Sequence, residues 1–127
     1  MRTHVAILGW AHILINGIHL LLGLLILLGF SGAGFLSALV GAIPLLPVLG
    51  GIGVFIFLLF AFVYLPGLLV GWGLLNYAPW ARILGIVVSI FDLLQLHTPW
   101  MIALGIYGLI VLFNAETVAL FERRQYR

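Results

Sequence analysis

Apolar residues fill four long runs, and the polar residues stand mainly at the ends of these runs. The runs cover residues 5–30, 51–76, 81–96 and 100–113. The first contains about 26 residues, and a helix of that length measures roughly 39 Å, enough to cross a hydrocarbon core with some tilt. The pattern therefore predicts an all-α membrane protein with a single domain of four transmembrane helices.

Proline and glycine residues mark the breaks between these runs. Pro44 and Pro47, followed by a glycine cluster, form the strongest break, because proline removes a backbone donor and clashes with the preceding helical turn. We therefore expect residues 35–49 to form a short interfacial or re-entrant segment. Pro66 falls inside the second span, where a kink is expected.

Two shorter breaks, at residues 77–80 and 97–99, separate the later spans. The tail, residues 114–127, has the pattern of an amphipathic helix, with Val118, Leu120 and Phe121 expected against lipid. At the other end, the first apolar run is longer than the hydrophobic region of a signal peptide, so an uncleaved first span is expected.

The positive charges indicate the topology. The sequence has no lysine, and its arginines are Arg2, Arg82, Arg123, Arg124 and Arg127. Four spans place all of them on one side of the membrane together with both termini, and the positive-inside rule makes that side cytoplasmic. A fifth span with a turn at residues 64–67 would scatter the arginines over both sides.

Composition excludes several classes of protein. Hydrophobic residues make up 65% of the chain and charged residues 6%, which leaves too little polar surface for a soluble protein. The absence of cysteine excludes disulfides and thiolate chemistry. The arginines are dispersed instead of forming one patch, which argues against nucleic-acid binding, so membrane lipids are the expected surroundings.

Motifs in the second half resemble those of a known group. They are Gly73-Leu-Leu-Asn-Tyr-Ala-Pro-Trp-Ala-Arg-Ile-Leu-Gly85, Ser89-Ile90, Ala103-Leu-Gly-Ile-Tyr-Gly-Leu-Ile-Val-Leu112 and Glu116. This pattern resembles a widespread group of small, uncharacterised bacterial four-helix membrane proteins. The resemblance implies a four-helix fold in a bacterial inner membrane and no particular activity. The polar sequence Gln95-Leu-His-Thr-Pro99 departs from the group's pattern.

The first run contains three polar residues on one stripe. His12, Asn16 and His19 are spaced i, i+4 and i+7, so they share one helix face that must meet protein. One interpretation is interhelical hydrogen bonding. The other is that His12 or His19 is an axial ligand of a haem or chlorophyll-type tetrapyrrole. His4 and His97 are expected to be solvated at the membrane surface, and only an inward His97 could supply a second axial histidine.

Asp92 is the only acidic residue well inside a predicted span. Counted along the helices, it lies at nearly the same depth as Asn16 and His19, so the four residues including His12 could form one polar layer. We expect Asp92 either to hydrogen-bond His19 or Asn16 or to be protonated. The layer could lock two helices together or relay a proton or ion.

Small residues follow two predicted packing faces. Ala81, Gly85 and Ser89 recur every four residues along the third span, and Gly67 and Gly71 share a face of the second. Small side chains let helix backbones approach closely in a membrane. These faces predict contacts between helices or between copies of the chain.

No catalytic or phosphate-binding constellation stands out, so we expect no enzyme. The sequence favours a small accessory or structural subunit of a larger membrane complex, such as a respiratory or photosynthetic assembly, or a homo-oligomer. A pigment- or haem-binding protein is the alternative. A small proton or ion transporter that uses Asp92 is the third.

Overall fold

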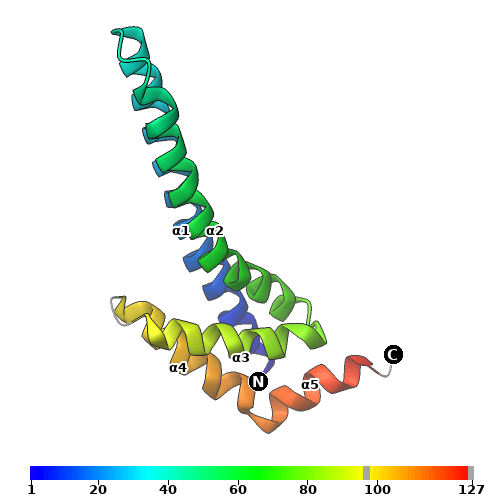
Figure 1. The fold of residues 1–127 in the computed structure, drawn as a ribbon. Coiled ribbons are helices and arrows are strands. Elements are labelled where there is room, and N and C mark those ends of the chain that lie inside the picture. Colours follow the sequence, from blue (N-terminus) through cyan, green and yellow to red (C-terminus); the bar gives the residue numbers. More distant parts are fainter. Residues whose placement is uncertain (96–97, 126–127) are drawn as a thin grey trace. The chain divides into compact units, whose positions relative to one another are not determined.

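The described chain consists of α-helices joined by short turns (Figure 1). The computed structural model describes residues 1–95 and 98–125, and the side chains only as far as residue 122. The helices are α1 (Arg2–Leu39), α2 (Leu45–Leu75), α3 (Pro79–Leu94), α4 (Pro99–Phe113) and α5 (Ala115–Gln125). These residues contain no strand, so the prediction of an all-α protein is confirmed.

The chain divides into two compact units. Residues Gly17–Leu65 form the first, which we call the hairpin, and Met1–Asn16 together with Pro66–Arg127 form the second, which we call the body. The hairpin sequence contains no Asp, Glu, Lys, Arg or Trp. All charged residues and all four tryptophans of the sequence therefore belong to the body.

Fewer helices could span a membrane than the sequence predicts. Among the described residues, α1 and α2 are long and apolar enough, with 38 and 31 residues. A third span results only if α4 and α5 are counted together, and this pair is bent by 67°. Helices α3 and α4 have 16 and 15 residues. They measure about 24 and 22 Å, less than a hydrocarbon core of about 30 Å.

The predicted interfacial segment at residues 35–49 is wrong. Helix α1 continues to Leu39, and Gly41, with φ +89°, ends it in the left-handed conformation. The N–H groups of Gly41 and Ala42 donate to Ala38 and Ser37 at 3.1 and 2.9 Å, the hydrogen bonds of a Schellman motif. Pro47 falls in the first turn of α2, where no N–H donor is needed.

Glycines bring the two helices of the hairpin together. The helices run antiparallel (Figure 1), and a Cβ atom at Gly23 would lie 2.8 Å from Phe60 Cβ. A Cβ at Gly53 would lie 3.0 Å from Phe30 Cβ. Each contact thus sets a glycine against a phenylalanine, and the two contacts are seven residues apart on each helix. This spacing is that of left-handed helix packing.

Helix α2 passes through residues 64–67 without a turn, so the five-span alternative is wrong. It ends in a second Schellman motif, in which Tyr77 has φ 51°. There the N–H groups of Tyr77 and Ala78 donate to Leu74 and Gly73 at 3.1 and 2.9 Å.

Helix α5 is part of the body's core. Its predicted lipid-facing residue Phe121 is only 3% exposed, and its ring lies 5.9 Å from that of Tyr77. Thr117, one turn earlier, is fully buried. The expectation that Phe121 faces lipid is therefore wrong, because one face of α5 packs against protein. Val118 and Leu120 are half-buried.

Candidate functional site

Among its described side chains the body buries five polar ones, and they are the candidates for a functional site. They are His12 and Asn16 on α1, Ser89 and Asp92 on α3, and Thr117 on α5. Burying a polar atom without a hydrogen bond costs free energy, so most buried polar groups have a partner. We therefore describe the hydrogen-bond partners of each residue.

Asn16 fixes the orientation of its neighbour His12. The Asn16 Nδ2 group donates to the carbonyl oxygen of His12 at 2.8 Å and lies 3.5 Å from His12 Nδ1. The amide therefore presents its N–H side to the ring, and we assign the proton of the neutral imidazole to Nε2. His12 Nε2 is buried and has no hydrogen-bond partner.

This arrangement does not fit a tetrapyrrole ligand at His12. An axial histidine offers the lone pair of one ring nitrogen and donates the other N–H to an acceptor. At His12 the polarity is reversed, since Nδ1 faces a donor. The side chain is also fully buried, with no open face toward a cofactor.

Asp92 lies near the end of α3 and is 3% exposed. Its Oδ2 atom has no hydrogen-bond partner. The predicted bond to Asn16 is not formed, because the Asn16 amide instead donates to His12 within α1. The carboxyl group is thus enclosed by the body without a clasp to α1.

Ser89 packs against the glycines of α4. A Cβ atom at Gly108 would collide with Ser89 Oγ, and one at Gly105 would lie 2.6 Å from the Ser89 carbonyl oxygen. The hydroxyls of Ser89 and Thr117 are buried without a hydrogen-bond partner.

The predicted small residues are buried at helix contacts. Ala81 and Gly85 on α3 are buried, and a Cβ at Gly85 would lie 2.9 Å from Leu112 on α4. On α2, a Cβ at Gly71 would lie 2.6 Å from the Gly9 carbonyl oxygen. Gly67 lies against the side chain of Asn16. These residues hold helices of the body together.

His19 lies in the hairpin, whereas the other three residues of the predicted polar layer lie in the body. Its ring stacks on Tyr64, with the ring centres 4.4 Å apart and the planes at 21°. Within residues 1–95 and 98–125, no group of three or more His, Cys, Asp or Glu residues could hold a metal ion.

The arginines differ in their surroundings. Arg82 donates its Nε–H to the carbonyl oxygen of Leu112 at 3.2 Å, near the end of α4, where a cation also meets the negative end of the helix dipole. Arg2 is exposed. The side chains of Arg123, Arg124 and Arg127 lie outside the described part of the chain, as does His97.

His4 is exposed, as predicted for a residue at the membrane surface. Its Nδ1 atom lies within hydrogen-bond distance of the Tyr107 hydroxyl, at 3.0 Å.

The sequence analysis did not identify the glycines that face the predicted small-residue faces from the neighbouring helices. Gly105 and Gly108 face Ser89, and Gly9 faces Gly71. A usable signal existed, because Gly105 and Gly108 are spaced i and i+3 on a short apolar helix and thus share a face.

Comparison with protein-family models, with curated proteins and with solved structures found no match for this chain.

Proposed function

We propose that the chain is a small accessory subunit, without catalysis of its own, that docks its apolar helices against a larger integral membrane complex. The observation that carries this proposal is the apolar length of α1. Residues 3–39 of this helix contain no Asp, Glu, Lys or Arg. Such a stretch measures about 56 Å, whereas a bilayer's hydrocarbon core is about 30 Å thick.

Tilt alone does not remove the mismatch. At a tilt of about 40°, the upper end of the usual range, the core accommodates roughly 39 Å of helix. About 17 Å of apolar α1 then extends beyond the hydrocarbon. Apolar surface outside the hydrocarbon is stabilised by contact with other apolar protein.

The hairpin surface is suited to such a contact. Its large side chains point outward on both helices, including Leu39 at 67% and Phe62 at 83% exposure. Gly29 and Gly32 on α1, and Gly50 and Gly51 on α2, have nothing within 4 Å of a Cβ position. The chain's own packing does not use these glycines, and they would let a partner helix approach closely.

The buried polar groups of the body support a role without catalysis. The hydroxyls of Ser89 and Thr117 have no hydrogen-bond partner, and the His12 side chain is fully buried. A respiratory or photosynthetic assembly remains our proposal for the host. The partner's defining chemistry is an apolar helical surface that extends beyond the hydrocarbon core.

Bulky substitutions at the unused glycines test this proposal. Gly32→Leu and Gly51→Leu should leave the chain folded and inserted but abolish its stoichiometric co-purification with a larger membrane complex in mild detergent. Val54→Leu, which adds bulk at a position 47% exposed in the same hairpin, is the matched control and should retain the complex. The proposal would be contradicted if all three variants recovered the complex equally well. It would also be contradicted if the wild-type chain purified with lipid alone.

A further inference from the structure

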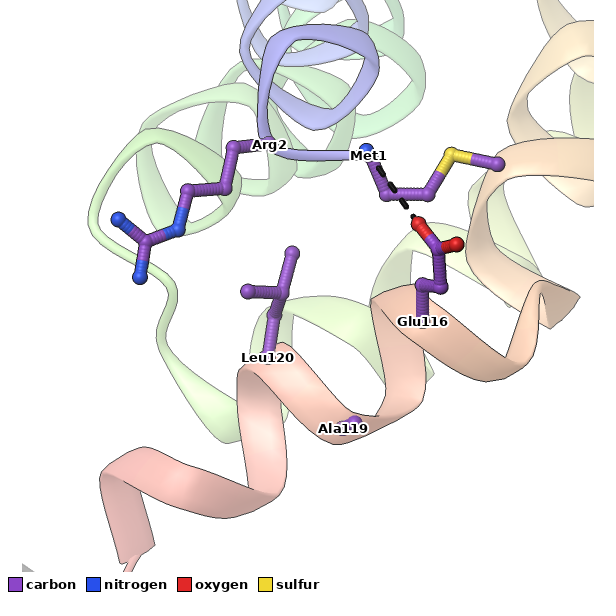
Figure 2. Close-up of a pocket in the computed structure, with 5 residues that line it drawn as sticks. All are labelled: Met1, Arg2, Glu116, Ala119 and Leu120. Carbon is purple, nitrogen blue, oxygen red and sulfur yellow. Dashed lines mark ion pairs between the residues drawn. The ribbon is translucent and has the colours of Figure 1, made fainter.

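The body contains a pocket beside the start of α1. Its volume is about 240 Å³, and Met1, Arg2, Glu116, Ala119 and Leu120 line it (Figure 2). The three α5 residues are spaced i, i+3 and i+4, so they share one helix face. That face is distinct from the one carrying the buried Thr117 and Phe121. The pocket therefore has a floor formed by α5 and a wall formed by the beginning of α1.

Of the charged groups beside this floor, two form an ion pair with each other and the third does not. The Met1 ammonium group lies 3.6 Å from Glu116 Oε2, so these two charges offset one another. Arg2 forms no ion pair with a described acidic group, and Figure 2 shows its guanidinium on the opposite side of Leu120 from Glu116. The pocket thus combines a cation that has no described acidic partner with an apolar floor of Ala119 and Leu120.

The unit that contains the pocket also carries residues typical of a membrane surface. All tryptophans of the chain belong to the body, and each is exposed, including Trp10 and Trp100 at 55%. Exposed tryptophan is enriched at the level of the lipid headgroups. An arginine at that level meets phosphate, which its planar guanidinium binds through paired hydrogen bonds.

We infer that this pocket binds the phosphate of an anionic membrane phospholipid, with Arg2 on the phosphate and Leu120 and Ala119 against the glycerol and upper acyl carbons. The volume is many times what one water molecule needs. The site explains why a cation without an acidic partner among the described residues stands over an apolar floor. It is independent of the docking surface on the hairpin, so either can fail without the other.

Native mass spectrometry of the full chain, released from nanodiscs of mixed phosphatidylglycerol and phosphatidylcholine, tests the site. Wild-type protein should retain one phosphatidylglycerol in preference to phosphatidylcholine. Arg2→Gln should reduce this retention about fivefold, as expected for one arginine near an anionic lipid. Leu120→Trp should reduce it by filling the pocket while leaving the charge unchanged.

Two acidic residues of α5 provide a matched pair of controls. Glu116→Gln frees the ammonium group and should increase retention, whereas Glu122→Gln makes the same change in charge on an exposed residue outside the pocket lining and should not. Equal retention by wild-type, Arg2→Gln and Leu120→Trp proteins would overturn the inference. Displacement of the retained lipid by millimolar inorganic phosphate would overturn phospholipid as the occupant.

Discussion

Gly67 on α2 lies directly against Asn16 on α1, and a Cβ atom at Gly67 would be 2.5 Å from the Asn16 side-chain atoms Cγ, Nδ2 and Oδ1. The amide fits there only because the facing residue has no side chain. The contact lies seven residues along each helix from the contact between Gly23 and Phe60. A glycine facing a larger residue is thus the recurring means by which α1 and α2 approach one another.

Substitution of Gly67 by alanine should destabilise the protein. The added methyl group collides with Asn16, and overpacking of this kind costs about 1–3 kcal/mol. The measurement is the free energy of unfolding in mixed micelles, followed by circular dichroism as the fraction of denaturing detergent rises. Gly51→Ala is the control, because nothing lies within 4 Å of its Cβ position. Equal stability of the two variants would refute the contact.

Phe121→Ala should be the most destabilising of the truncations considered. Phe121 is 3% exposed and packs on Tyr77, and removal of a buried phenyl ring costs about 3–5 kcal/mol. Phe113→Ala removes the same side chain at a position 62% exposed and should change stability little. Thermal unfolding in detergent compares the two. If Phe113→Ala lowers the melting temperature as much as Phe121→Ala, α5 does not pack as described.

Asp92→Asn should not destabilise the protein. The Asp92 Oδ2 atom is buried without a hydrogen-bond partner, and the substitution replaces this carboxyl group with a neutral amide of the same shape. The free energy of unfolding of the variant should equal or exceed that of the wild type. A loss of more than about 2 kcal/mol would indicate that an ionised Asp92 is paired, as expected for a clasp.

Arg82→Gln should weaken the contact between α3 and the end of α4. The variant loses the hydrogen bond from Arg82 Nε to the Leu112 carbonyl oxygen and the cation near the helix end, together about 1 kcal/mol. Arg2→Gln removes the same charge from an exposed side chain without an ion pair to a described acidic group, and should leave stability unchanged. Loss of stability in both variants would point to a general effect of charge.

The sequence predicted the helical class and most helix ends in the second half of the chain. The turns at residues 77–80 and 97–99 agree with the ends of α2 and α3 and the starts of α3 and α4. Proline at the first position of α3 and of α4 explains this success, because it fits a helix start and disfavours helix in the residue before it.

The first half was harder to predict because nearly every residue in it is apolar. A uniformly apolar helix has no polar face or charged cap to mark its ends. Gly34 lies within α1 at a helix contact, so it did not end the helix, whereas Gly41 did. Which glycine takes a positive φ depends on the partner helix, and that information is not local to the sequence.

The candidate site was predicted in part of its members but not in its contacts: Thr117 is buried and was not predicted, and the predicted His19 lies in the hairpin. The spacing of His12 and Asn16 correctly placed both on one helix face, and both are buried. The spacing could not reveal that the Asn16 amide bonds within α1, because this depends on the rotamer that Gly67 permits. Asp92 consequently lacks the predicted Asn16 partner.

Native mass spectrometry of the particle extracted from its own membranes in mild detergent is the sharpest test of whether the chain is an accessory subunit. We expect a large complex that contains one or a few copies of this chain, with no tetrapyrrole attached to it. A free or self-associated chain that carries only lipid, or one that carries a stoichiometric haem or chlorin, would refute the role of accessory subunit.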